Sequence, residues 1–95
     1  MQTIPETYTQ AGHSMSLFRR EGTVAMYRSQ GKDYWEVHRI RIAPPKTFPS
    51  GKHYPEREIL AGNEDFGEFG WACVTQERAD SRFAEALTIE KRNRP

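Results

Sequence analysis

Two stretches of alternating hydrophobic and polar residues predict β-strands in the first half of the chain. Residues 23–28 (TVAMYR) alternate and are rich in residues that favour strands. Residues 34–42 (YWEVHRIRI) form a second predicted strand, and the five residues between the two, which include Gly31, are typical of a hairpin loop. The second strand ends at Pro44 and Pro45, because proline cannot donate a hydrogen bond to a strand ladder.

The apolar residues of the second strand change face along its length. Trp35 and Val37 share one face, whereas Ile40 and Ile42 share the other. A bulge near residues 38–39 would bring all four apolar side chains to one face. Alternatively, both faces of the strand are partly covered, and the pattern alone leaves the two arrangements open.

The C-terminal third predicts one more strand followed by a helix. Residues 69–75 (FGWACVT) alternate in a strand pattern, and a helix then begins at Thr75 or Gln76 and ends near Lys91. Its apolar residues recur at i, i+4, i+7 and i+8, which is the spacing of one helix face. These residues are Ala79, Phe83, Ala86 and Leu87.

This order of elements predicts an α+β fold. The simplest arrangement is a small three-stranded antiparallel sheet, in β-β-β-α order, with the one C-terminal helix packed on it. Residues 15–95 are expected to form this single domain, and residues 1–14, which are polar and lack a period, a flexible leader. A chain of 95 residues is marginally stable alone, so a homodimer is a reasonable expectation.

Residues 44–70 form an unusually long connection between the second and third predicted strands. They contain four of the six prolines and four of the seven glycines. A connection this long is either functional or partly structured. We expect a turn at Ser50 and Gly51 in a partner-facing part (residues 44–58), then a short helical turn capped by Asn63. Phe66, Phe69 and Trp71 should pack into the scaffold.

Composition and charge exclude several classes of protein. The net charge is +1, whereas a generic polyanion binder is expected to be more basic. Residues 17–58 nevertheless carry nine basic against five acidic side chains, and residues 59–80 carry one against five. No apolar run is long enough to span a bilayer, and the N-terminus lacks a signal-peptide pattern, so a cytoplasmic protein is expected.

No group of residues has the pattern of a catalytic or metal site. The single cysteine, Cys73, lies in a strand pattern and is expected to be a small buried residue rather than an activated thiolate. The spacings of His13, His38 and His53 match no metal motif. The acidic groups at residues 56–58 and 64–68 have polar neighbours that favour a solvated face. We therefore predict a protein that is not an enzyme and has no cofactor or metal.

The best candidate for a contact surface combines arginine, lysine and aromatic residues around the second strand. Such residues suit a protein interface, and they also suit phosphate contacts with base stacking. The alternative is an exposed strand face whose charges discourage edge pairing. The predicted binding residues are Tyr34, Trp35, Arg39, Arg41, Lys46 and Lys52.

Several short motifs between Leu17 and Leu87 carry a resemblance. They are VAMY at residues 24–27, YWEVHRI at 34–40, the Pro49/Gly51 turn, NEDFG at 63–67 with Gly70-Trp71, and Ala79 with Phe83. In these motifs the chain resembles short uncharacterised proteins of phages, prophages and mobile elements. The resemblance implies an accessory protein of a mobile element. It transfers no catalytic residue, because that family has no established activity.

Together these observations predict a small non-enzymatic binding protein that acts through contact with another protein. In the setting that the resemblance implies, this contact would inhibit a host defence complex. The alternative is a nucleic-acid-binding module that uses the basic and aromatic strand face.

Overall fold

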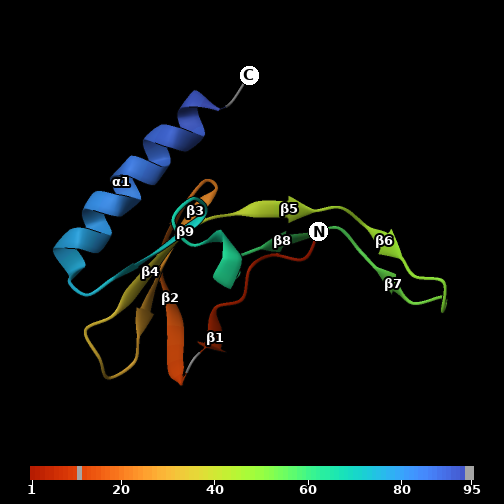
Figure 1. The fold of residues 1–95 in the computed structure, drawn as a ribbon, viewed down its shortest axis with the longest axis horizontal. Helices are drawn as coiled ribbons and strands as arrows, with labels where there is room; N and C mark the ends of the chain where they lie inside the picture. Colours follow the sequence, from red (N-terminus) through yellow and green to blue (C-terminus); the bar gives the residue numbers. More distant parts are fainter. Residues whose placement is uncertain (11, 94–95) are drawn as a thin grey trace.

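The computed structural model describes residues 1–10 and 12–93, which form an antiparallel five-stranded sheet with one helix packed on it (Figure 1). The strand order is β1-β2-β3-β4-β9. The strands are β1 (Thr7–Gln10), β2 (His13–Glu21), β3 (Val24–Ser29), β4 (Trp35–Arg39) and β9 (Gly70–Cys73), and the helix is α1 (Gln76–Arg92). The predicted α+β class with a C-terminal helix is therefore confirmed.

The prediction of a three-stranded sheet is wrong, because β1 and β2 add two strands before the predicted hairpin. Within the expected leader, Ile4 is buried, and Thr7–Gln10 pairs with β2 from Thr7 opposite Ser16 to Gln10 opposite His13. One face of β1 is exposed, which explains why its sequence is polar. Residue 11 of the expected leader and residues 94–95 of the expected domain lie outside the described residues.

The central strand β4 is covered on both faces. All five of its residues are buried, so the second of the two arrangements that the sequence left open is the observed one. Trp35 and Val37 belong to a cluster beneath the helix, whereas Ile40 belongs to a cluster on the opposite face of the sheet. The strand ladder is interrupted at Ile40, and Ile42 beyond it is exposed.

Two hydrophobic clusters thus sandwich the sheet. The cluster on the helix side contains Val24, Met26, Trp35, Val37, Cys73, Ala79, Phe83 and Ala86. The cluster on the other side contains Ile4, Met15, Ala25, Tyr27 and Ile40, and Tyr8, Leu17, Tyr34 and Leu60 pack against it. The second cluster depends on the N-terminal residues, which is why they are part of the fold.

The helix matches its sequence prediction closely. Thr75 is the N-cap, and its Oγ1 accepts a hydrogen bond from the backbone N–H of Arg78 at 3.2 Å. Three residues of the predicted apolar face, Ala79, Phe83 and Ala86, are buried against the sheet. Lys91 and Arg92 lie in the last turn, where positive charge complements the helix dipole.

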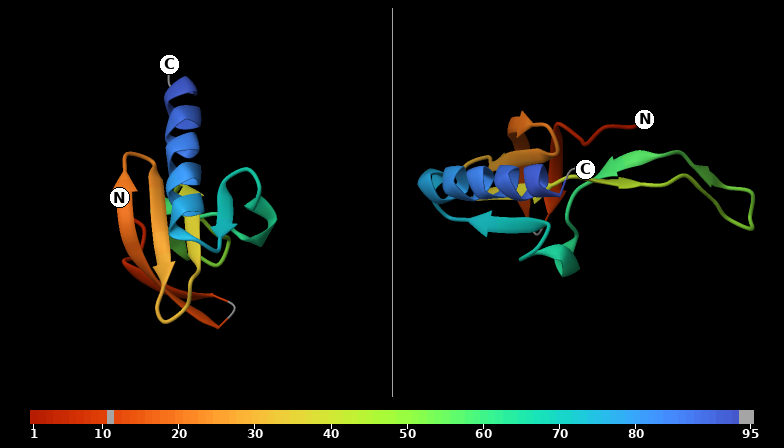
Figure 2. Two further views of the ribbon diagram at one scale, coloured as in Figure 1. Left: turned by 90° about the vertical axis from the view of Figure 1, so that its left-hand side faces the viewer. Right: turned by 90° about the horizontal axis from the view of Figure 1, so that it is seen from above.

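The connection between β4 and β9 is mostly a projecting β-ribbon, which we call the arm (residues 41–59). Figure 2 shows it extending away from the sheet and the helix. It consists of β5 (Arg41–Ala43) paired with β8 (Arg57–Ile59), and β6 (Lys46–Thr47) paired with β7 (His53–Tyr54). A 3₁₀ turn, η1 (Asn63–Asp65), follows the arm.

The 3₁₀ turn begins one residue earlier than the sequence predicts. Gly62, not Asn63, is the N-cap, and its N–H donates to Oδ2 of Asp65 at 3.0 Å. Gly70 lies directly beneath this segment: a Cβ atom there would come within 2.6 Å of Ala61 Cβ and 3.2 Å of the Phe66 ring. Glycine is therefore required at residue 70 by close packing.

Within the described residues, no helix combines the length and apolarity that crossing a bilayer requires.

Replacing Phe83 tests the importance of the helix-side cluster. Phe83 is 1% exposed, so Phe83→Ala should lower the free energy of unfolding by about 3–5 kcal/mol through lost burial and a residual cavity. Urea unfolding followed by circular dichroism, at one protein concentration, measures this change. Phe18→Ala, at a residue that is 46% exposed, is the control and should change stability by less than about 0.5 kcal/mol. Equal losses in the two variants would contradict the assignment of the core.

Candidate functional site

The tip of the arm is a tight turn built by proline and glycine. The N–H of Gly51 donates to the carbonyl of Phe48 at 2.9 Å, and the N–H of Phe48 donates to the carbonyl of Lys52 at 2.9 Å. Pro49 follows Phe48, where the fixed φ of proline suits a β-turn, and Gly51 has a φ of +88°, which other residues rarely adopt. This confirms the predicted turn chemistry and shows that it closes a two-stranded ribbon.

One face of the arm carries an alternation of cations and aromatic rings. Residues two apart in a strand share a face, and Lys46 lies directly opposite Tyr54 in the ladder. The Phe48 and Tyr54 rings meet edge to face, with centroids 5.4 Å apart. Lys46 Nζ lies 4.8 Å from the Phe48 centroid, and Lys52 Nζ lies 5.4 Å from that of Tyr54. We call Lys46, Phe48, Lys52 and Tyr54 the cation–aromatic face.

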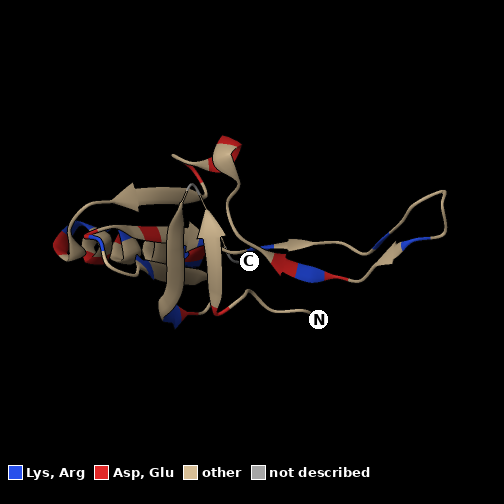
Figure 3. Cartoon of the chain, turned by 90° about the horizontal axis from the view of Figure 1, so that it is seen from below, with Lys and Arg blue, Asp and Glu red and all other residues tan. Residues whose placement is uncertain are grey.

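The charge of the arm changes from its base to its tip (Figure 3). Both of its carboxylates, Glu56 and Glu58, lie near the base, whereas the outer residues 44–55 carry Lys46 and Lys52 and no acidic side chain. On the opposite face of the outer ribbon, Thr47 Oγ1 and His53 Nδ1 lie 2.9 Å apart. The outer arm therefore presents positive charge and aromatic surface away from residues 59–80, which follow it along the chain and are mostly acidic in charge.

The base of the arm is tied to the body by a bidentate ion pair. The Arg20 guanidinium donates to both oxygens of Glu58 at 2.8 and 2.6 Å, and the N–H of Ile4 donates to the same carboxylate at 3.1 Å. The hydrogen bond from Arg20 holds the pKa of Glu58 below its usual range. Gln2 bonds to the backbone of the arm, because the N–H of Glu58 donates to its carbonyl at 2.8 Å. The N-terminal residues thus brace the arm.

A second set of contacts fixes the other strand of the base. Arg41 pairs with Asp65 at 2.5 Å, and the hydrogen bonds from the Gly62 N–H and from Arg41 lower the pKa of Asp65. The guanidinium groups of Arg39 and Arg41 lie 4.8 and 4.3 Å from the centroid of the Phe69 ring. These contacts link the base of the arm to the 3₁₀ turn.

The six predicted binding residues do not share one exposed surface. Trp35 and Arg39 are buried, and Arg39 Nε lies 3.5 Å from Glu90 of the helix. Arg41 is engaged at the base of the arm as described above, and Tyr34 donates a hydrogen bond to Glu36 within the second cluster. Only Lys46 and Lys52 lie together on an exposed face, at the outer arm.

The aromatic partners of these lysines, Phe48 and Tyr54, were not among the predicted binding residues. In a hairpin over residues 46–54, strand alternation would place residues 46 and 48 on one face together with residues 52 and 54. The hairpin itself is hard to recognise in the sequence, because Pro44, Pro45 and Pro55 obscure the strand pattern.

A buried polar cluster within the sheet is the second arrangement of chemical interest. Oε1 of Glu36 accepts hydrogen bonds from the Tyr8 hydroxyl and from Nε2 of His38, the latter at 3.0 Å, and Oε2 accepts one from the Tyr34 hydroxyl at 2.7 Å. His38 Nδ1 accepts from the N–H of Ala61 at 3.1 Å, which places the ring hydrogen on Nε2. Every polar atom of the His38 ring is therefore used within the protein.

The electrostatics of this cluster fit a structural role. Burial raises the pKa of Glu36, but hydrogen bonds from His38, Tyr8 and Tyr34 outweigh burial, so the pKa lies below its usual range. A general acid or base would instead need a pKa shifted toward neutrality. Cys73 is buried, and burial raises the pKa of its thiol despite the nearby Arg82 and Arg78, so it is not an activated thiolate.

Among residues 1–10 and 12–93, no three His, Cys, Asp or Glu side chains come together in a group that could hold a metal ion. Comparisons of the chain with protein-family models, with curated proteins and with solved structures gave no match.

Removing one hydroxyl tests the buried cluster. Tyr8→Phe should lower the free energy of unfolding by about 1.5–3 kcal/mol at pH 7, because it removes a hydrogen bond to a buried ionised carboxylate. Urea unfolding measures the change. Tyr54→Phe is the matched control, since the Tyr54 hydroxyl makes no hydrogen bond to any residue that the structure describes. A loss of the same size in Tyr54→Phe would argue against a special role of the cluster.

The tyrosines also predict how stability changes at alkaline pH. Burial raises the pKa of Tyr27 to about 12, and burial together with the Glu36 carboxylate raises those of Tyr8 and Tyr34 further. Because the unfolded state ionises first, near pH 10, stability should be full below that pH and fall as the pH rises above it. Absorbance at 295 nm should show these three tyrosines ionising only as the protein unfolds. Ionisation of all three near pH 10 in the folded protein would be inconsistent with their burial.

Proposed function

We propose that this protein is a non-enzymatic binding module and that the cation–aromatic face of the arm is its contact surface for another protein. The observation that carries the proposal is the outer arm itself. There Phe48 and Tyr54 stand edge to face, each with a lysine over its ring, on a ribbon that projects from the body. A ribbon that only connected β4 to β9 would not need to project in this way.

The chemistry of the face indicates the kind of partner. Aromatic rings supply large, rigid contact area, and lysines beside them favour a partner surface that carries carboxylates. Arg20, Glu58 and Gln2 already fix the base of the arm, so little conformational entropy is lost there when the arm binds. A protein partner with an acidic rim around an apolar depression fits these features.

A nucleic acid is the second candidate, and one observation favours it. The outer arm is a two-stranded ribbon with Pro49 and Phe48 at its tip and no carboxylate between residues 44 and 55. A two-stranded ribbon of this kind fits the major groove of DNA. Only two lysines lie on the face, which gives few phosphate contacts, so we rank this candidate second.

A role as an accessory factor of a mobile element, and inhibition of a host defence complex in particular, stays a prediction. It rests on the resemblance of the sequence motifs and not on the arm. The arm fits this role because binding alone, without chemistry, suffices to block a complex.

Charge reversal on the arm tests the proposal. A photo-cross-linking residue in place of Phe48 should form an adduct with a specific protein in an extract of the organism that encodes the chain. Adding Lys46→Glu and Lys52→Glu should reduce that adduct at least about tenfold, because two lysines that attract the partner's carboxylates become glutamates that repel them. The control combines Lys32→Glu with Lys91→Glu, which makes the same charge change at exposed residues of the body and should leave the adduct intact.

The same variants separate the two candidates. Anisotropy titrations with labelled single- and double-stranded oligonucleotides, at low and at physiological salt, measure nucleic-acid binding. Binding that weakens steeply with salt and is lost in the arm variant, with no protein adduct, would replace the first candidate by the second. An adduct that persists in the arm variant would show that the lysines of the arm do not form the contact surface.

A further inference from the structure

The strand β9 is an edge of the sheet whose outer side is bridged by Phe66 at Gly70 and is open beyond it. It pairs with β4 on one side only, from Gly70 opposite His38 to Cys73 opposite Trp35. On its outer side, the N–H of Gly67 donates to the carbonyl of Gly70 at 2.7 Å. Figure 2 shows β9 as the outermost strand beside the helix. An unpaired edge of this kind is a template for another strand.

The hydrogen bonds of β9 fix which backbone groups point outward. The carbonyl of Phe69 accepts from the N–H of Arg39, so residues 69, 71 and 73 point their backbone groups toward β4. The carbonyl of Gly70 points outward, and the backbone groups of Ala72, two residues further along the same strand, do the same. Val74 follows the end of β9, at a bend that leads into the helix. Among the described residues, no element outside the sheet donates to or accepts from the backbone of Ala72 or Val74.

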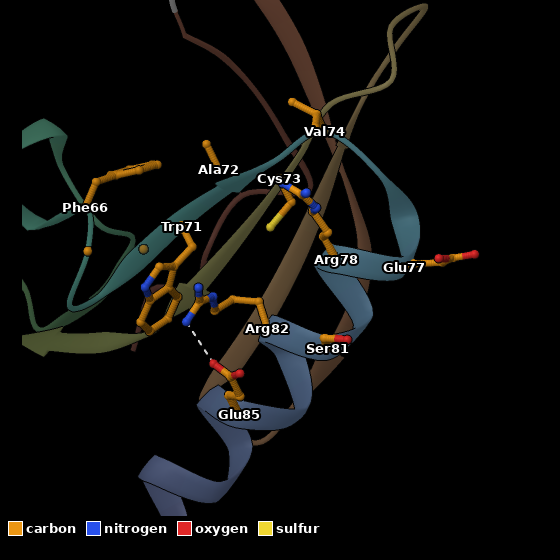
Figure 4. Close-up of a pocket in the computed structure, with 12 residues that line it drawn as sticks. Phe66, Trp71, Ala72, Cys73, Val74, Glu77, Arg78, Ser81, Arg82 and Glu85 are labelled. Carbon is orange, nitrogen blue, oxygen red and sulfur yellow. Dashed lines mark hydrogen bonds and ion pairs between the residues drawn. The ribbon is translucent and has the colours of Figure 1, made fainter.

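The side chains along this edge suit pairing rather than solvent. Ala72 is exposed, and Val74 is 59% exposed, although neither carries a polar group. Both point away from the helix in Figure 4, whereas Trp71 and Cys73 lie on the helix side. Proteins usually protect an open edge with a charge or a proline, and this stretch carries neither.

The helix beside the edge carries charges that complement themselves. A groove of about 870 Å³ between β9 and α1 is lined by Trp71 and by two acidic and two basic side chains of the helix. These are Glu77, Arg78, Arg82 and Glu85. Arg82 lies 5.2 Å from the Trp71 ring centroid and pairs with Glu85 at 2.8 Å. A flank with equal numbers of both signs can face a copy of itself, while a flank of one sign would repel it.

We propose that the β9 edge binds the β9 edge of a second copy of this chain, in antiparallel orientation, so that two five-stranded sheets join into one. On pairing, Val74 extends β9 by one residue, so that Ala72 of each copy lies opposite Val74 of the other. Each of these pairs exchanges two backbone hydrogen bonds, and Cys73 lies on the twofold axis. The two helices then lie on the same face of the joined sheet, with their charged flanks toward each other. This contact is independent of the arm.

Two substitutions break this contact without touching the core. Val74→Lys puts a charge on the open edge at an exposed residue. Ala72→Pro removes only an outward-pointing N–H, so the ladder with β4 is retained. Sedimentation equilibrium should give twice the chain mass of 11.0 kDa for the natural chain. Each variant should raise the dissociation constant at least about tenfold while circular dichroism still reports the fold. Phe18→Lys, at another exposed apolar residue, is the control and should leave the dimer unchanged.

Cross-linking through Cys73 tests the register of this contact separately. A central pair without hydrogen bonds places the two Cα atoms about 4.5 Å apart, within the range that a disulfide spans. Treatment with diamide, which takes up the two electrons and two protons, should therefore link two chains through Cys73, and Cys73→Ser should dimerise without this link. A natural chain that stays monomeric at 200 µM, or a dimer that survives both Val74→Lys and Ala72→Pro, would overturn the proposal. A dimer that these variants dissociate but that never cross-links would overturn the register.

Discussion

The burial of one carboxylate, that of Glu36, is the constraint on which the rest of the structure depends. A charge in the central strand is tolerated only when donors surround it, and Tyr8, Tyr34 and His38 are those donors. Tyr8 comes from the first strand, so this strand must fold back over the sheet. His38 in turn accepts from the N–H of Ala61, which fixes the chain where it returns from the arm. One buried charge therefore joins the N-terminus, the sheet and the base of the arm.

The sequence reveals the elements whose patterns are local and misses those that depend on distant partners. The helix is predicted because Ala79, Phe83 and Ala86 repeat at its period, and β3 because its residues are apolar and favour strands. Strand β1 is missed because its threonines are exposed and only Tyr8 packs against the second cluster, so the strand shows no hydrophobic alternation. The opposite phases of Trp35 and Ile40 were compatible with a bulge or with coverage of both faces, and the N-terminal residues that cover the second face decide between them.

The candidate site was only partly predictable, for a similar reason. Lys46 and Lys52 were identified from charge and turn chemistry, which are local. Arg39 and Trp35 were placed beside them because strand parity does not say which face a helix will cover. The ribbon that pairs Lys46 with Tyr54 contains only two residues on each side, between prolines, and so has no period to detect. Its pairing is set by the turn at Gly51.

The two proposed surfaces lie at different ends of the molecule, and this has a consequence for binding. The arm continues from the end of β4 that lies beside Gly70, so it leaves the sheet at that end of β9. A twofold axis through Cys73 and normal to the sheet reverses the direction of the second copy, which sends the two arms toward opposite ends of the joined sheet. Both arms then cannot bind a single compact surface. Dimerisation would strengthen binding only toward a partner whose sites repeat or are far apart, because only such a partner engages both arms at once.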